Sequence, residues 1–472
     1  MSISSAYTIA GSGLRATEAR AEIVAGNIAN ASTAGYVRRD ALLVSSASGD
    51  GQSVDLRMAR QVDERLASLS RNAGADAGGA GVTGEILRGY LLTLGEPGDE
   101  VSPAARIADF QAGLDLLANN PSDKAVQNDV LNRADSLVRS LNTASATLNR
   151  SSVQAGDAFG SSIRDVNSLL SDVAEINRQL TSASEGTQGT GSLRDQLNRT
   201  LDTLGSQLDF KTRPEADGTV TVYTSGGTEL VRGDKAARLT GDRQTGALFV
   251  GGIDVTPGQD GARGFAAGRL AGLSELISTV MPQMNLQLDE LARGMIQTFE
   301  QADASVAAGQ PGFFTDSQGA FDPAQLDGLA GRLAVNDSLR PEKGGALWRL
   351  RDGAGATVEG EAGDTAQINA FIGIFDQALP VDPEAGLGSP ARLGDYAADM
   401  VGFQQTLRVT ADSRASAATV RLVSLEDGRS NIEGVNIDVE LQKLMEIEKA
   451  YGANSQVLST LNDMLDSLLN SV

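Results

Sequence analysis

Residues 3–36 read ISSAYTIAGSGLRATEARAEIVAGNIANASTAGY, and this stretch decides the fold. At alternating intervals of four and three residues its side chains are apolar, apart from one threonine: Ile3, Tyr7, Ala10, Leu14, Thr17, Ala21, Val24, Ile28 and Ala31. Such a repeat is typical of a helix that packs lengthwise against another helix. Because several of these positions are alanine, we expect the partner helix to approach closely.

The C-terminal end carries a matching repeat. Nine of its eleven positions are apolar: Ile437, Glu440, Leu444, Ile447, Tyr451, Asn454, Leu458, Leu461, Leu465, Leu468 and Val472. Asn454 is the kind of polar residue that fixes the register of paired helices. Leu441, Met445 and Leu469 form a second apolar stripe, so this helix could contact two neighbours, as a helical assembly requires. A two-helix hairpin buried in a monomer would explain the repeats equally well.

We therefore define a predicted assembly seam from the larger side chains of the two repeats. Its members are Ile3, Tyr7, Leu14, Val24, Ile28, Leu444, Ile447, Tyr451, Leu458, Leu461, Leu465 and Leu468. An isolated terminal helix cannot bury such a stripe, and ordering it costs about 1–2 kcal/mol per residue in backbone entropy. Packing against other subunits would supply that free energy, so we expect these ends to fold on assembly.

The residues between the ends are helical, then β-rich, then helical again. Helical spacing covers 104–118, a second helix that Ser122 could cap, then 163–180, 193–208 and 270–296. Short β-rich runs separated by glycine turns fill 209–261. The glycine-rich segment 74–84 is interpreted as a flexible linker. Residues 305–393 are mixed, and a last helix pair follows from Tyr396.

The predicted fold is mainly α with an inserted small β domain, elongated, with nested discontinuous domains and terminal helices paired as a coiled coil. Residues 1–45 and 432–472 would form the terminal coiled-coil domain. Residues 46–208, 262–304 and 394–431 would form a helical domain that carries the inserted β domain, 209–261. Residues 305–393 would be a mixed segment packed on the helical domain.

Composition excludes several classes of function. Of 472 residues, 39 are Lys or Arg and 61 are Asp or Glu, so the net charge is −22. Such a chain repels phosphate backbones and anionic lipid, so we expect no nucleic-acid and no membrane partner. The chain has no histidine and no cysteine, which excludes a Ser-His-Asp triad, a histidine zinc site and a thiol nucleophile. We expect no enzyme, no cofactor and no metal.

Two N-terminal features have familiar readings that we reject. Residues 11–16 match the G-x-G-x-x-A dinucleotide fingerprint, but no strand precedes them, so close helix packing is the better interpretation. The first 24 residues lack the uninterrupted apolar region of a secretory signal peptide, and no stretch reaches the roughly 20 apolar residues that span a bilayer. If the protein is exported, we expect a route that needs no cleaved leader.

Residues 27–36, NIANASTAGY, end the N-terminal repeat. Asn30, Ser32 and Thr33 can satisfy backbone groups where the helix stops, and Gly35 can adopt a positive φ. Tyr36 would then lie against the helix end. A generic helix terminator would have the same features.

The segment also resembles the signature near the N-terminus of the flagellar axial proteins, the rod, hook and hook-associated family. The matching residues are Asn27, Ile28, Ala29, Asn30, Thr33, Gly35 and Tyr36. Gly26 replaces the usual first asparagine, and Ala34 stands where proline is common. Ala118–Asp123, Ile176–Leu180 with Leu193–Leu197, and Gly434–Asp438 resemble the hook-associated members of this family in particular.

The resemblance implies a structural protein of the extracellular bacterial flagellum, at the junction of hook and filament. Such subunits pass unfolded through the flagellar type III export channel and assemble at the hook tip through their terminal helices. The implied partners are hook protein, a second junction protein, further copies of the chain in a ring or helix, and an export chaperone at the C-terminal helix. The alternatives are another axial component, either the second junction protein or hook protein, and a secreted coiled-coil effector.

Overall fold

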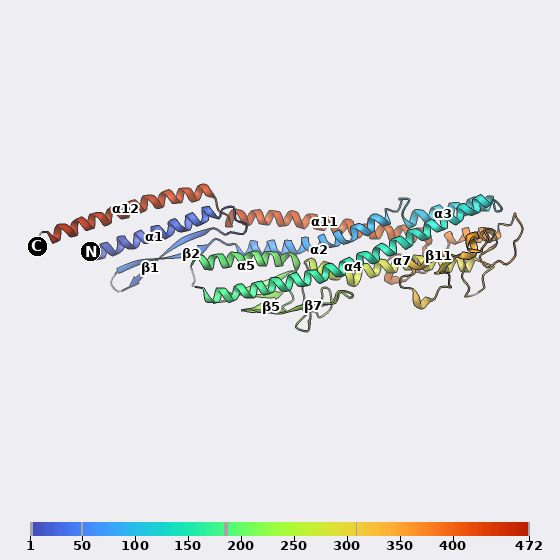
Figure 1. The fold of residues 1–472 in the computed structure, drawn as a ribbon, viewed down its shortest axis with the longest axis horizontal. Helices are drawn as coiled ribbons and strands as arrows, with labels where there is room; N and C mark the ends of the chain where they lie inside the picture. Colours follow the sequence, from blue (N-terminus) through green and yellow to red (C-terminus); the bar gives the residue numbers. More distant parts are fainter. Residues whose placement is uncertain (1–2, 49–50, 184–186, 308, 471–472) are drawn as a thin grey trace.

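A computed structural model describes residues 3–48, 51–183, 187–307 and 309–470. The molecule is elongated, with long helices running close to its long axis (Figure 1). Both chain ends lie at the same end of the molecule, and the chain between them reaches the opposite end and returns. The fold is mainly α with small antiparallel sheets, which confirms the predicted fold class.

Four elements make up the end that carries the termini. They are α1 (Ile3–Ala29), β1 (Arg39–Ser48), β2 (Gly51–Arg60) and α12 (Ile437–Leu469). The helix α1 packs along α12 and also against the antiparallel hairpin of β1 and β2. The hairpin was not predicted, and the predicted domain boundary after residue 45 falls inside β1. We call these four elements the terminal unit.

The rest of the molecule, which we call the body, is built on α7 (Met281–Ala302), described below, and on further long helices. They are α2 (Glu64–Leu94), α3 (Pro103–Asn119), α4 (Lys124–Ser182), α5 (Gln188–Gln207) and α11 (Leu393–Glu433). The helix α4 is continuous over both segments that the sequence predicted separately. The N-cap of α4 is Asp123, whose carboxylate accepts hydrogen bonds from Ala125 N and Val126 N, and not the predicted Ser122.

The segment 74–84 is not a linker but part of α2, so that interpretation was wrong. Its glycines allow other backbone segments to come very close to the helix. A Cβ atom added to Gly78 would lie 2.3 Å from the carbonyl oxygen of Ser206, and one added to Gly79 would lie 2.9 Å from that of Gly268. Packing therefore compensates the helix-weakening effect of glycine here.

The β region predicted at 209–261 consists of two small antiparallel sheets. One contains β3 (Phe210–Pro214), β4 (Val220–Thr224), β5 (Glu229–Arg232) and β6 (Lys235–Ala236), and the other contains β7 (Leu239–Gly241), β8 (Leu248–Val250) and β9 (Ile253–Asp254). Two asparagines of α4 hold these sheets. Asn177 bonds Val220 N, Val220 O and Gly233 O, and Asn167 bonds both Leu239 N and Leu239 O.

After the β region the chain is helical again. The helices α6 (Arg269–Glu275) and α7 (Met281–Ala302) are joined by a π-helical turn, Leu276–Val280. This wider turn precedes Pro282, whose nitrogen cannot donate a helical hydrogen bond.

The mixed segment at the end far from the termini has only short elements. They are β10 (Phe314–Asp316), α8 (Leu329–Arg332), β11 (Leu333–Val335), α9 (Arg349–Asp352), α10 (Ala366–Gly373), β12 (Ala378–Leu379) and β13 (Ala391–Arg392), with several 3-10 turns between them. Six phenylalanines from α3, α7 and this segment form an aromatic cluster: Phe110, Phe299, Phe313, Phe314, Phe371 and Phe375. This cluster belongs to one apolar core that extends from Val82 to Val401.

Candidate functional site

The two terminal helices lie side by side, as Figure 1 shows for α1 in blue and α12 in red. Among the members of the predicted assembly seam, Val24 and Ile447 are buried within the single chain. Leu14, Ile28, Leu444, Leu458 and Leu461 are half-buried, whereas Tyr7, Tyr451 and Leu465 are exposed. The side chains of Ile3 and Leu468 lie outside the described residues. Part of the seam thus faces the partner helix and part of it faces solvent.

Close approach of the two helices is visible at Gly13. A Cβ atom added there would lie 3.2 Å from Asn454 Nδ2, so the glycine of one helix faces the polar residue of the other. Ile23, which was not among the predicted seam residues, is buried beside Val24. The hairpin also covers α1, so the buried stripe of this helix is wider than a two-helix seam requires.

Asn27 is the hydrogen-bonding centre of this region. Its side chain is fully buried, and its Oδ1 accepts from Tyr36 OH at 2.9 Å and from Arg39 N at 3.1 Å. Its Nδ2 donates to Arg39 O at 2.8 Å and to Glu440 Oε2 at 2.9 Å. This one side chain therefore connects α1, the start of the hairpin and α12, and its hydrogen-bonding capacity is filled.

Glu440, one of the two polar residues in the C-terminal repeat, is the matching group on α12. Its side chain is fully buried, and Lys443 Nζ donates to Glu440 Oε1 at 2.9 Å and to Asp40 Oδ1 at 2.9 Å. Burial alone would raise the pKa of Asp40, but the hydrogen bond and attraction of Lys443 lower that pKa overall. The terminal helix pair is thus fixed by a paired charge network as well as by its apolar stripe.

The end of α1 follows the predicted arrangement at Asn30, Gly35 and Tyr36, whereas the Thr33 hydroxyl donates to the side chain of Asn30 and not to a backbone group. Gly35 has a φ of 70°, and Asn30 Nδ2 bonds the carbonyl oxygen of Gly26. The Tyr36 hydroxyl reaches back to Asn27 in the last turns of α1, and burial raises the pKa of Tyr36. A Cβ atom at position 35 would lie 2.6 Å from Arg199 Cγ, so this glycine also makes room for a side chain of α5.

A second cluster connects the hairpin to the body. Asp195 on α5 is buried, and its two carboxylate oxygens bond Arg39 at 3.1 Å and Arg60 at 2.7 Å. The Arg39 guanidinium also lies over the Tyr36 ring, 4.9 Å from its centroid. Sequence reasoning missed Arg39, Arg60 and Asp195, because charged residues far apart in the chain show no periodic pattern that would pair them.

Comparison with known proteins relates these elements to flagellar families. A family model described as the helical domain of flagellar hook-associated protein FlgK matches residues 93–313. The model of flagella basal body rod proteins matches residues 8–36, which contain most of α1 and the turn that follows it. The C-terminal model of the flagellar basal body rod FlgEFG proteins matches residues 426–471, which contain α12.

Curated relatives match almost the whole chain. Flagellar hook-associated protein 1 of Bacillus subtilis is 22% identical over 97% of this chain and 96% of its own length. The proteins of the same name from Escherichia coli and Salmonella typhimurium are 23% and 24% identical, over 99% of this chain and 100% of their own lengths. The chain is thus similar over nearly its full length to flagellar hook-associated proteins, and both of its ends match models of flagellar rod proteins.

A solved structure, the flagellar hook junction protein FlgK from Burkholderia pseudomallei, matches with a TM-score of 0.43 and 20% identity. That match covers 52% of this chain and 46% of the solved chain.

The rod-protein match at 8–36 includes the signature at 27–36. The chain after the signature was expected to enter a helical domain at residue 46, whereas the structure places β1 and β2 there. The helical-domain match of the hook-associated proteins begins further on, at residue 93.

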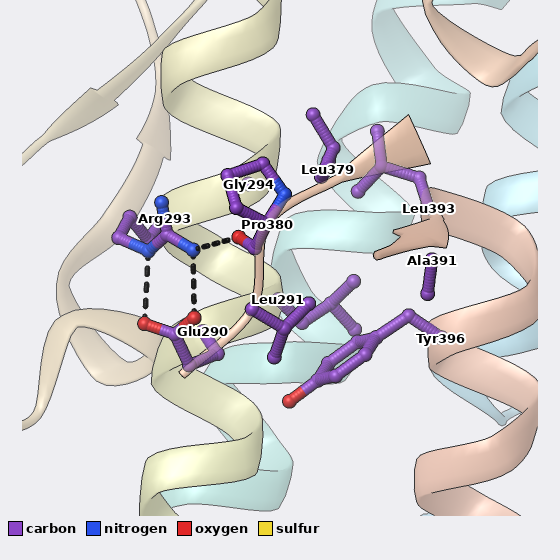
Figure 2. A pocket seen from close by; sticks show the side chains of 10 residues that line it. Glu290, Leu291, Arg293, Gly294, Leu379, Pro380, Ala391, Leu393 and Tyr396 are labelled. Atoms are coloured by element: carbon purple, nitrogen blue, oxygen red, sulfur yellow. Dashed lines mark hydrogen bonds and ion pairs between the residues drawn. The ribbon is translucent and has the colours of Figure 1, made fainter. Parts of the chain in front are cut away.

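The hook-associated proteins that match are structural flagellar proteins and not a known family of enzymes. Among the residues that the structure describes, no cluster of three or more metal-ligating side chains occurs, and no helix is long and apolar enough to cross a membrane. A small pocket lies between α7, β12 and the start of α11 (Figure 2). Its polar groups are already paired, because Arg293 bonds both Glu290 and the carbonyl oxygen of Pro380 at 2.7 Å.

Proposed function

We propose that this chain is a structural junction protein that joins the flagellar hook to the filament. The observation that carries the proposal is the match of hook-associated proteins over nearly the full chain, with rod-family models centred on both terminal helices. Its position would be extracellular, at the tip of the hook. Along the flagellum, its partners would be hook protein on the side of the cell and a second junction protein on the side of the filament. Further copies of the chain would be its neighbours in the same layer.

Assembly would use the side chains that the terminal pair leaves uncovered. Tyr7, Tyr451 and Leu465 are 46%, 43% and 37% exposed, and Leu441 and Met445 of the second apolar stripe are 45% and 55% exposed. Apolar surface on both outer faces of a helix pair suits contact with two neighbouring subunits, where its burial would favour association. The chain would pass unfolded through the export channel, and an export chaperone would cover the C-terminal helix before assembly.

Electron microscopy of cells that lack the gene, with an assay for flagellin in the medium, tests the proposed position. Hooks without filaments, together with flagellin released into the medium, would support a junction protein. Missing hooks would indicate a rod or hook component instead. Intact, working filaments would contradict every axial role and leave the secreted effector.

The role of the C-terminal helix is tested separately by replacing Leu461 and Leu465 with aspartate. Because burying an unpaired carboxylate is strongly unfavourable, the double variant should fail to assemble, while its circular dichroism spectrum still shows a folded body. The control is Leu92→Asp on α2, since Leu92 is 77% exposed but belongs to the body. Normal filaments with the double variant would show that this part of the seam is not an assembly contact.

A further inference from the structure

The apolar core of the body does not continue into the terminal unit. The core cluster begins at Val82 and ends at Val401, and within the described residues it has no member in α1, β1, β2 or α12. The buried apolar residues of the terminal unit, such as Ile23, Val24, Val37 and Ile447, form no part of that cluster. Hydrophobic burial therefore stabilises each part separately.

Polar groups make the connection between the two parts. Beside the Asp195 cluster, the Arg38 N–H donates to the carbonyl oxygen of Glu433 at 2.7 Å, and the carboxylate of Glu433 accepts from Asp63 N–H within the body at 3.3 Å. Glu433 ends α11 and is held by Arg429, which also bonds Asp202 on α5. These contacts lie close to the two places where the chain passes between the parts, after residue 60 and after residue 433.

Asp195 is the residue of the body that pairs with both strands of the hairpin. Arg39 and Arg60 are a cross-strand pair at the base of the hairpin, where β1 begins and β2 ends. Asp195 binds both arginines at once, one with each carboxylate oxygen, and its side chain is only 4% exposed. One buried carboxylate of the body thus fixes the direction in which both strands leave it.

We propose that the junction is an ionic hinge in which Asp195 is the positioning residue that sets the orientation of the terminal unit relative to the body. Loss of this carboxylate leaves two largely buried guanidinium groups without their anion, which is strongly unfavourable. Since no shared apolar core opposes movement, the hairpin reorients to return these charges to water. The body keeps its fold, because its core does not depend on the junction.

The chain offers a matched control on the same helix. Asp202 lies seven residues after Asp195 on α5 and also pairs with two arginines, Arg71 and Arg429. Both of these arginines belong to the body, on α2 and α11. Asp202→Asn therefore removes two arginine contacts within the body, at a carboxylate that is 35% exposed, and removes no bond of the hairpin. Arg38 bonds the backbone of Glu433 and not the carboxylate that Arg429 holds.

Spin labels can follow the hinge directly, because the chain has no native cysteine. Cysteines replace the exposed Arg57 on β2 and Thr203 on α5 in the full-length protein, and pulsed electron paramagnetic resonance measures the distance between the labels. We expect a narrow distribution for the parent and for Asp202→Asn, and a distribution at least about twofold broader for Asp195→Asn. Arg60→Gln, which removes one of the two arginines, should give an intermediate width.

Circular dichroism melting of each labelled variant shows whether the body stays folded. If Asp195→Asn unfolds the body, the test rests on the milder Arg60→Gln variant. A folded Arg60→Gln protein whose distance distribution is as narrow as that of the parent would contradict the ionic hinge. The proposal is also wrong if a folded Asp195→Asn keeps the narrow distribution, if Asp202→Asn broadens it equally, or if the parent distribution is already broad.

Discussion

At the scale of single residues, Asn27 is the signature residue for which the structure gives the clearest reason. Its amide makes four hydrogen bonds, to Tyr36, Arg39 and Glu440, and has no access to solvent. No other side chain of similar size offers two donors and an acceptor in that geometry, and aspartate would place a second carboxylate against Glu440. The family signature at this position is thus explained by the need to join α1, the hairpin and α12.

Replacing Asn27 with alanine should destabilise the terminal unit by about 2–3 kcal/mol, because Glu440 Oε2 and two groups of Arg39 lose a buried partner. Hydrogen exchange of α1 amides in the assembled protein measures this loss as faster exchange. Asn30→Ala is the control, since Asn30 is only half-buried and bonds its own helix, at Gly26 O. Equal protection of α1 in the two variants would show that Asn27 is not the centre of this network.

Asp289 allows a pH-dependent test within the body. This carboxylate of α7 is 3% exposed and accepts hydrogen bonds from Gly328 N and Ala330 N at 2.8 Å each. Burial raises its pKa to about 6, although the two N–H donors oppose that shift. Because the folded pKa lies above the unfolded value, its contribution to stability is complete below about pH 4 and is lost as the pH rises through about 6.

The comparison of the wild type with Asp289→Asn isolates this group from the other carboxylates. The free energy of unfolding of the wild type minus that of the variant should fall by about 3 kcal/mol between pH 4 and pH 7, since the amide does not titrate. Urea unfolding at the two pH values measures both quantities. A pH-independent difference would mean that folding does not raise the pKa of Asp289.

At the scale of elements, the glycines of α2 can be divided by what surrounds them. Gly78 faces the backbone of α5, whereas a Cβ atom added to Gly81 would meet nothing within 4 Å. Gly78→Ala should therefore destabilise the body by about 1–3 kcal/mol through overpacking. Gly81→Ala should stabilise it by up to about 1 kcal/mol, because alanine favours the helix. Thermal melting of both variants checks the opposite signs, and shifts of the same sign would contradict this account.

The same elements show how far the sequence leads. The terminal helices, the turn at Gly35 and the β region of 209–261 follow from local patterns, because periodicity and glycine turns are written in consecutive residues. The sequence of the hairpin does contain a strand pattern, since Val54, Leu56 and Met58 alternate with Asp55 and Arg57. It was not recognised, because residues 46–208 were assigned as a whole to the helical domain.

Other features could not be read from the sequence. The glycines of α2 resemble a linker until the backbones that pack on them are known. Likewise, nothing local predicts that Asp195 pairs with residues 156 and 135 positions away in the sequence.

At the scale of the whole molecule, the two parts differ in what stabilises them. Among the residues that the structure describes, the body has one apolar core within 82–401, whereas the terminal unit has a narrow stripe between α1, α12 and the hairpin and leaves many apolar side chains exposed. The predicted division at 45 and 432 would cut β1 and separate most of it from β2. The distribution of the core favours a division near residues 61 and 434 instead, with the hairpin assigned to the terminal unit.

This division predicts that residues 62–433 fold without the terminal unit. The fragment retains Asp63, which caps α2, and every member of the core, so its main melting transition should lie within a few degrees of that of the full chain. Calorimetry of both proteins measures this. A second fragment, residues 96–433, lacks α2 and with it the buried Leu87, Tyr90 and Leu91, and it should lose cooperative unfolding because large core side chains contribute several kcal/mol each. If residues 62–433 also failed to unfold cooperatively, the body would depend on the terminal unit, and the ionic hinge would have to be replaced by a folding interface.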